Sequence, residues 1–416
     1  MGAFFIILSK TILMKRCIIV LLAILTIATA CKKKEANQEQ PYLIVLSLDG
    51  FRWDYPQNAY TPTLDSLKAV GVIAESLKPS YPTKTFPNHY TMATGLYPDH
   101  HGLVDNYFHA PDLDKIYSMK DREAIEDGTF YGGEPIWVTA ENQSVKSATF
   151  FWVGSEAEIK GVRPSFWYKY DWTIPFENRI DSVAKWLSLP ESKRPHLIMW
   201  YYSEPDHTGH EAGPESEETK LLIEELDTYL NKFFTRMRRL PEFNQLNFII
   251  TSDHGMNATS NDRTINIEQI IDTNDIEFID GITPNVNIKV KEGKLNEVFD
   301  ELKATPNLQV WKHGELPERL HYGTHIRTHD ISMVADPGWT FINSKYPDAI
   351  AGAHGFDNDL KDMHAIFYAA GPAFKSNHTH PTFENVNLYV LFAEILNLTP
   401  AETDGDIANI EQMLNR

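Results

Sequence analysis

Three apolar runs of strand length set the narrowest limit on what this chain can fold into. They are YLIVLSL at 42–48, HLIMWYY at 196–202 and LNFIIT at 246–251. A strand with one face in water alternates apolar and polar residues, whereas a nearly continuous apolar run is typical of a strand buried on both faces of a parallel sheet. Each run is followed within a few residues by Asp or His. In open α/β sheets, the loops after the carboxyl ends of the strands are the usual place for an active site.

Helix-like segments lie between these runs. They are TPTLDSLKAVG at 61–71, with Thr61 as a candidate cap and Gly71 as a stop, PFENRIDSVAKWLSL at 175–189, and SEETKLLIEELDTYLNKFFTRMRR at 216–239. The alternation predicts an α/β fold with a mainly parallel central sheet flanked by helices. The segment from about 258 to 345 breaks this rhythm with short apolar stretches around one helix-like segment at 294–305. We expect it to form a small inserted α+β subdomain.

The first thirty residues carry an export signature. Lys15 and Arg16 precede the apolar run CIIVLLAILTIATA, which ends in small residues directly before Cys31. This pattern is too short for a membrane span and resembles a bacterial lipobox, so it predicts a signal peptide over 1–30 and lipidation of Cys31. The start is either Met1 or Met14, because MKRCIIVLLAIL is already a complete signal. We therefore expect an exported protein that is lipid-anchored in the cell envelope, in the periplasm or at the outer membrane.

Composition and charge limit the classes of partner that this protein can bind. The polar KKKEANQEQ predicts a flexible tether over 31–40, so the membrane would be touched only through the anchor. The formal net charge of -19, with no sustained run of Lys and Arg, excludes a nucleic-acid duplex as the natural partner. Both cysteines, Cys17 and Cys31, lie in the leader, so the globular part has no disulfide.

Four short motifs gather side chains that bind metals. Together they offer three carboxylates and three imidazoles, which suit zinc or a similar divalent ion and, with one hydroxyl, divide naturally into two sites. A single Asp or His at a strand end is more often a cap or a turn residue, but all four motifs fall at predicted strand ends or in Gly-flanked loops. The motifs are LSLDG with Asp49, EPDHTGHEAGP with Asp206 and His210, TSDHG with Asp253 and His254, and GAHGFDN with His354.

Thr85, in YPTKTFPNHYTMATG, has two interpretations. A Thr hydroxyl is a poor nucleophile unless a base or a metal activates it, and a two-metal site would make Thr85 that nucleophile. Pro87 fits a first helical turn, which would place Thr85 at a helix N-terminus, with Asn106 of GLVDN as a donor to the same oxyanion. The alternative is that Thr85 is only an N-cap. We interpret Lys84 as a solvated residue at least as readily as an active one, and the remaining histidines, such as His89 and His101, as structural or surface residues.

The motifs PTKTFPNHYTMATGLYPDHHGLVDN, EPDHTGHEAGP, SDHGM and HGFDN resemble the nucleotide pyrophosphatase/phosphodiesterase family of the alkaline phosphatase superfamily, from about Tyr42 to about Ala373. The resemblance implies that 41–416 is a phosphodiesterase catalytic domain, with Thr85 as nucleophile and Asn106 as oxyanion donor. It also implies two zinc ions (Zn2+) per chain. One would be held by Asp49, Thr85, Asp253 and His254, and the other by Asp206, His210 and His354.

The resemblance also implies a substrate and a reaction. Phe86, Tyr170 and Tyr201 match aromatic positions that pack around the base in family members acting on nucleotides, although core packing is an equally good interpretation of each. The implied reaction is hydrolysis of nucleotide pyrophosphates or phosphodiesters to nucleoside 5'-monophosphates through a phospho-threonine intermediate. We expect a monomer whose partner is a small nucleotide or phosphodiester.

Other functions stay open. The enzyme alternatives are a phosphodiesterase for lysophospholipid or choline-type diesters and an alkaline-phosphatase-like phosphomonoesterase. A sulfatase is disfavoured, because TKTFPNH contains no Cys or Ser in a C/S-x-P-x-R context. A lipoprotein that binds metal or carbohydrate without catalysis would keep the ligands and make Thr85 a cap.

Overall fold

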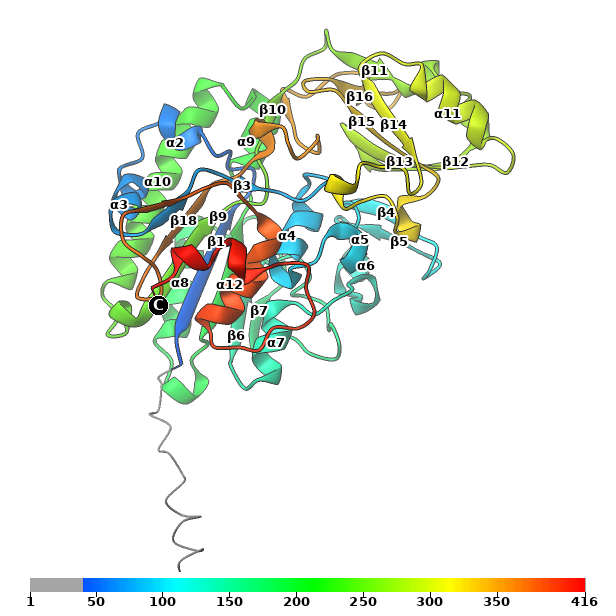
Figure 1. The fold of residues 1–416 in the computed structure, drawn as a ribbon. Helices are drawn as coiled ribbons and strands as arrows, with labels where there is room; N and C mark the ends of the chain where they lie inside the picture. Colours follow the sequence, from blue (N-terminus) through cyan, green and yellow to red (C-terminus); the bar gives the residue numbers. More distant parts are fainter. Residues whose placement is uncertain (1–39, 416) are drawn as a thin grey trace, which may run out of the picture. The chain divides into compact units, whose positions relative to one another are not determined.

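The computed structural model describes residues 40–415, and an eight-stranded sheet forms the centre of this part of the chain (Figure 1). The strand order is β19-β2-β18-β9-β1-β8-β6-β7. Strand β18 is antiparallel to both its neighbours, β9 and β2, and the other neighbouring pairs are parallel. The bounds are β1 Tyr42–Leu48, β2 Val72–Ala74, β6 Ser147–Phe150, β7 Phe166–Tyr168, β8 Leu197–Tyr202, β9 Leu246–Thr251, β18 Phe367–Ala370 and β19 His378–His380. The predicted mainly parallel α/β fold is confirmed.

The side chains of β1 explain why its sequence is apolar throughout. Leu43 and Val45 pack into one hydrophobic cluster, with α4, α7 and α12. Ile44, Leu46 and Leu48 pack into a second cluster, with α3, α8 and α10. The central strand is thus covered by helices on both faces, as a parallel sheet requires. The helix bounds are α3 Pro62–Val70, α4 Thr85–Thr94, α7 Ile136–Asn142, α8 Phe176–Leu187, α10 Glu217–Met237 and α12 Leu388–Ile395.

Helix α3 begins where predicted, but the expected capping residue does not cap it. Thr61 precedes the helix as predicted, but its side chain makes no capping hydrogen bond. The carboxylate of Asp227, in α10, instead accepts hydrogen bonds from the backbone N–H groups of Thr63 and Leu64 at 2.9 Å each. The helix is therefore capped by Asp227, which is distant in the sequence, and not by the side chain of Thr61.

A second sheet lies between β9 and β18 in the sequence. Its four antiparallel strands have the order β12-β13-β15-β14, and α11 (Leu295–Lys303) contacts β14. Its strands are β12 Ile276–Ile282, β13 Asn285–Val290, β14 Leu308–Lys312 and β15 Ile331–Ala335. We call these four strands the small sheet. Shorter pairs are β4 (Tyr107–Ala110) with β5 (Lys115–Ser118), and β10 (Asn257–Ala258) with β17 (Gly352–Ala353).

Within residues 40–415, no helix has the length and apolar character needed to cross a membrane. The predicted signal peptide over 1–30, the lipidation of Cys31 and all of the tether except Gln40 lie outside the described residues.

Candidate metal centre and active site

The predicted ligands converge at the carboxyl edge of the central sheet. Asp49 follows β1, Asp253 and His254 follow β9, and Asp206 begins α9 (Asp206–Ala212) shortly after β8. The backbone joins two of these segments, because the Asp206 N–H donates to the Asp49 carbonyl at 2.9 Å. Neighbouring parallel strands end at the same edge, so residues about 200 positions apart meet there.

One group comprises Asp49, Asp253 and His254, whose ligand atoms all lie within 4.8 Å of one another. The His254 Nε2 atom is 3.1 Å from Asp253 Oδ2 and 3.4 Å from Asp49 Oδ1. Thr85 Oγ1 lies 3.2 Å from the same nitrogen. The structure therefore brings all four residues predicted for the first ion together.

The second group comprises Asp206, His254 and His354, again with ligand atoms within 4.8 Å of one another. His210 belongs beside it, since Nε2 of His210 and Nε2 of His354 are each 3.4 Å from Asp206 Oδ1. Asp206 and His210 are one turn apart on α9, which is the helical i, i+4 arrangement considered from the sequence. The two groups share His254, an arrangement consistent with a binuclear metal site.

Backbone carbonyls fix how the imidazoles face the carboxylates. Nδ1 of His210 lies 2.8 Å from the Gly352 carbonyl oxygen, and Nδ1 of His354 lies 2.9 Å from that of Thr83. Nδ1 of His254 has the same relation to the next residue's carbonyl at 2.9 Å. Because a carbonyl only accepts, each Nδ1 carries the proton and donates it, and each Nε2 keeps a lone pair for a metal.

The carboxylates fit a bound cation. Asp49 Oδ1, Asp206 Oδ1 and Asp253 Oδ2 are buried and take part in no hydrogen bond among the described residues. Burial, and then the neighbouring carboxylates of Asp253 and Asp206, raises the pKa of Asp49 well above its usual range. Buried anions this close need positive charge between them. Divalent ions would supply it, and a mixed oxygen and imidazole set suits zinc.

The pKa values of two other ligands favour the metal-binding state. Burial would raise the pKa of Asp253, but the imidazoles of His254 and His89 outweigh it and lower that pKa below its ordinary value. Burial, and then the neighbouring rings of His254 and His210, lowers the pKa of His354 well below its usual range. Metals bind neutral imidazole and ionised carboxylate, and both pKa shifts are in the direction of those forms.

Thr85 begins helix α4, and Lys84 occupies the capping position. The alternative that Thr85 is the N-cap is therefore wrong. Asn106 Oδ1 accepts the N–H of Phe86 at 2.9 Å, which occupies one N–H of the helix end but leaves the Asn106 amide group as a donor. Thr85 and Asn106, the two residues predicted to act on the phosphoryl group, are thus linked through the backbone of Phe86.

The three predicted aromatic residues do not behave alike. The ring of Phe86 packs edge-on against Tyr117, with centroids 6.1 Å apart. Tyr170 is 41% exposed and lies 6.2 Å from the ring of Tyr201. The Tyr201 hydroxyl donates a hydrogen bond to Asp49 Oδ2 at 2.5 Å. Tyr201 therefore has a contact that orients a ligand, which the stacking interpretation did not include.

Two further residues lie beside the site: the solvated interpretation of Lys84 is wrong, and His89 is a buried structural residue, one of the two roles expected of it. Lys84 is buried, not solvated, and forms an ion pair with buried Asp105 at 2.9 Å. His89 Nδ1 lies 2.9 Å from the Thr85 carbonyl and 3.3 Å from Asp253 Oδ2. The position of His89 four residues after Thr85 was a usable signal, because i and i+4 are adjacent on a helix. Lys84 carried no comparable local signal.

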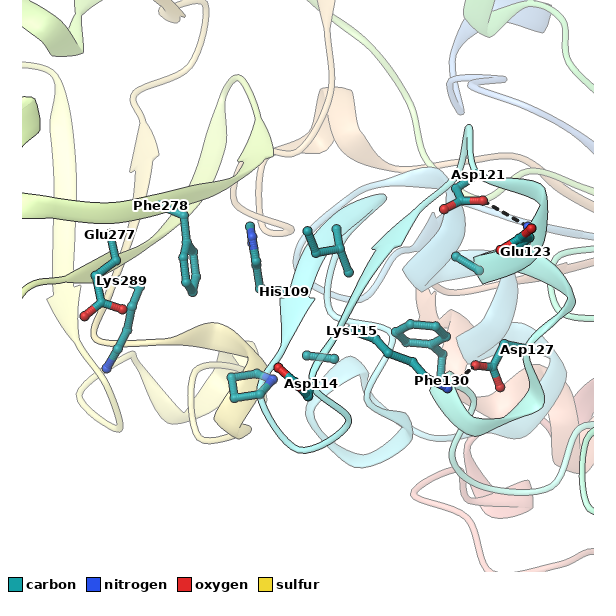
Figure 2. Close-up of a pocket in the computed structure, with 14 residues that line it drawn as sticks. His109, Asp114, Lys115, Asp121, Glu123, Asp127, Phe130, Glu277, Phe278 and Lys289 are labelled. Carbon is teal, nitrogen blue, oxygen red and sulfur yellow. Dashed lines mark hydrogen bonds and ion pairs between the residues drawn. The ribbon is translucent and has the colours of Figure 1, made fainter.

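A cavity of about 980 Å³ opens between the β4–β5 hairpin and the small sheet. Its walls include His109 from β4 and Phe278 from β12, whose rings stack with centroids 3.8 Å apart (Figure 2). The lining contains none of the eleven predicted site residues. The cavity is therefore separate from the two metal groups.

Comparison with known proteins places these residues in context. The family model described as type I phosphodiesterase/nucleotide pyrophosphatase matches residues 43–357. Venom phosphodiesterase CdcPDE of Crotalus durissus collilineatus is 37% identical over 399 residues, covering 93% of this chain and 48% of that protein. Human ectonucleotide pyrophosphatase/phosphodiesterase family member 5 is 36% identical over 398 residues, covering 95% of this chain and 82% of that protein. The chain thus spans about half the length of the venom enzymes that it matches.

Solved structures agree with these matches. Murine ectonucleotide pyrophosphatase/phosphodiesterase 5 superposes with a TM-score of 0.86 at 37% identity, covering 90% of this chain and 100% of that one. An inactive threonine-to-alanine variant of the murine protein, in complex with AMP, superposes with a TM-score of 0.86 at 36% identity, covering 91% and 100%.

Proposed function

This chain belongs to the type I phosphodiesterase/nucleotide pyrophosphatase family of the alkaline phosphatase superfamily, and we propose that it is a two-zinc hydrolase that releases nucleoside 5'-monophosphates from nucleotide pyrophosphates and phosphodiesters. The observation that carries this proposal is the convergence of three buried carboxylate oxygens that accept no hydrogen bond within residues 40–415, and three oriented imidazoles, beside the Thr85 hydroxyl. The murine relative that binds AMP and is inactive as a threonine-to-alanine variant supports the nucleotide and the role of Thr85.

The ions would be held as two sets. Asp49, Thr85, Asp253 and His254 would hold one, and Asp206, His210 and His354 the other. Bound zinc would lower the pKa of the Thr85 hydroxyl and of the attacking water, and would stabilise the attacking and leaving oxygens.

The chain's own residues arrange the reaction. The Thr85 hydroxyl gives up its proton to water, and its oxygen forms a bond to phosphorus as the bond to the leaving-group oxygen breaks. This gives phospho-threonine and a leaving group that departs as an anion or takes up a proton from water. The Asn106 amide would donate to the phosphoryl oxygen that gains charge, since its other end is held by the Phe86 N–H. Water then attacks the phosphorus and Thr85 leaves, which regenerates the hydroxyl and releases the monophosphate. Phe86 and Tyr170 would pack around the base.

The test is steady-state hydrolysis of p-nitrophenyl thymidine 5'-monophosphate, p-nitrophenyl phosphate and p-nitrophenylphosphocholine, side by side, with zinc added. We expect kcat/KM to favour the diester by about a hundredfold or more, which is about 2.7 kcal/mol of transition-state binding. Preference for the monoester would place the enzyme with the phosphatases. Preference for p-nitrophenylphosphocholine would indicate a choline-type diesterase.

We also propose that the protein is an exported monomer anchored in the cell envelope through a lipid on Cys31. The charged and apolar pattern of the leader supports the anchor. Mass spectrometry of the N-terminal peptide tests it, with a diacylglyceryl-modified Cys31 expected and an unmodified Cys31 contradicting it.

A further inference from the structure

An ion pair is buried directly beside the proposed catalytic residues. Lys84 precedes Thr85 and is 2% exposed, and Asp105 precedes Asn106 and is 0% exposed. The Lys84 ammonium lies 2.9 Å and 3.2 Å from the two carboxylate oxygens of Asp105. Each partner of the pair is therefore one peptide away from a group that would act on the phosphoryl group.

The pair is one of two links between the same two segments. Asp105 Oδ1 also accepts the backbone N–H of Asn106 at 2.7 Å, which fixes the start of the Asn106 backbone. The second link is the hydrogen bond from the Phe86 N–H to Asn106 Oδ1 at 2.9 Å. Thr85 lies between Lys84 and Phe86, so both links together set where its hydroxyl stands relative to the Asn106 amide.

The small sheet contacts both members of the Lys84–Asp105 ion pair. The Lys84 ammonium donates to the Asn285 carbonyl oxygen, in β13, at 3.0 Å. Gly281, in β12, has φ +88°, and a Cβ built on it would lie 2.9 Å from Asp105 Oδ2. Only glycine allows the strand to come this close to the carboxylate. The stacked rings of His109 and Phe278 hold β12 against β4 nearby (Figure 2).

The same segment holds a metal ligand. The Thr83 carbonyl accepts from His354 Nδ1 at 2.9 Å, and the Thr83 hydroxyl accepts from the Gly355 N–H at 2.9 Å. A Cβ built on Gly355 would be 3.0 Å from the Lys84 Cε atom. The Lys84 side chain therefore fills the space between the nucleophile segment, the His354 loop and the small sheet.

We propose that Lys84 is a positioning residue, which with Asp105 holds Thr85 and Asn106 in the geometry of in-line attack and ties that geometry to the small sheet. This rests on the proposed hydrolase function. Replacing a buried ion pair by uncharged residues of similar volume is often neutral or stabilising, so stability alone does not explain the pair. A displacement of about 1 Å between reacting groups can cost about a hundredfold in rate, which gives the pair a catalytic value.

The test is the double variant Lys84→Met/Asp105→Asn, which removes both charges and keeps an oxygen that can accept the Asn106 N–H. We expect kcat on p-nitrophenyl thymidine 5'-monophosphate to fall about a hundredfold, with KM within threefold of wild type, two zinc ions per chain retained and the melting temperature within a few degrees. Wild-type kcat in the folded double variant would overturn the proposal.

Arg327→Met is the matched control. Arg327 is 4% exposed and pairs with Asp112 at 2.7 Å, but it also donates to the carbonyls of Gly102 and Phe130 and lies over the rings of Phe108 and Phe130. We expect a lower melting temperature and a kcat within threefold of wild type. A kcat loss in Arg327→Met as large as that of the double variant would show that removing any buried cation slows the enzyme, and would overturn the specific role of Lys84.

If the double variant fails to fold, Gly281→Ala decides: its Cβ would press on Asp105 Oδ2 and on the Asn285 carbonyl that accepts from Lys84, while both charges remain. A tenfold or larger fall in kcat, at unchanged zinc content, supports the proposal, and wild-type kcat overturns it. The proposed function fails separately: a wild-type protein that hydrolyses no phosphate ester refutes the hydrolase and this proposal together, whereas an active wild type with an equally active double variant refutes this proposal alone.

Discussion

Replacing Tyr201 by Phe removes one hydroxyl and keeps the ring, so it separates two roles for this residue. The hydroxyl donates to Asp49 Oδ2 at 2.5 Å, and Asp49 is buried. A hydrogen bond to a charged group contributes about 1.5–3 kcal/mol, which corresponds to about a 10- to 100-fold change in an equilibrium constant. Groups that orient metal ligands typically have effects of this size on metal affinity or activity. We therefore expect Tyr201→Phe to weaken zinc binding by about 10- to 100-fold.

The assay is zinc competition against a chelating dye, with kcat/KM measured at limiting and at saturating zinc. The loss of kcat/KM should be largest at limiting zinc and should recover in part at saturation. Tyr202→Phe is the control, because the adjacent Tyr202 ring lies under the Arg179 guanidinium at 4.8 Å and makes no such contact with a ligand. If Tyr201→Phe keeps wild-type zinc affinity and kcat/KM within threefold, the orienting role is refuted and ring packing remains.

Three further outcomes are expected. Thr85→Ala should lower turnover by about three orders of magnitude or more while AMP still binds by calorimetry, and turnover within tenfold of wild type would rule out Thr85 as the nucleophile. His354→Ala should reduce the metal content from two ions to one by elemental analysis, and two retained ions would contradict the assignment. Burial, and then the neighbouring His325, lowers the pKa of His101 to about 3. The unfolded chain, but not the folded one, then gains a proton as pH falls below 6.5, so this group alone should cost about 2 kcal/mol of stability between pH 7 and pH 5. Denaturant unfolding at both pH values tests this, and His101→Gln should remove that part of the acid sensitivity; an unchanged pH dependence in the variant would refute it.

Features that depend on local pattern were predictable. The run at 42–48 became β1 because a strand covered on both faces needs apolar residues at every position. Asp49 and Asp253 were placed correctly because ligand-bearing loops follow parallel strands. The entry of Thr85 into a helix followed from Pro87, which fits a first turn.

Features that depend on distant partners were not predictable. Lys84 is buried against Asp105 and the Asn285 carbonyl, which lie 21 and 201 residues away in the sequence. The residues next to Lys84 in the sequence do not indicate either contact. The carboxylate that caps α3 is likewise 163 residues or more from the N–H groups that it accepts. For Tyr201, the family resemblance implied a ring packed around a base, whereas its hydroxyl contact depends on the register between β1 and β8. Register is a property of the pairing, which a single strand does not encode.

The pairing of β1 with β9 has a consequence for engineering metal preference. Asp49 and Asp253 extend from adjacent strands whose backbones are paired from Tyr42↔Leu246 to Ser47↔Thr251. Hydrogen-bonded strands stand about 4.7–4.9 Å apart, so the paired strands constrain the backbone from which these two carboxylates start, one and two residues beyond the strand ends. His354 and the Asp206–His210 turn come from a loop and a seven-residue helix. A programme to change which ion the enzyme accepts should therefore vary His354, Asp206 and His210, since Asp49 and Asp253 directly follow paired strands of the sheet.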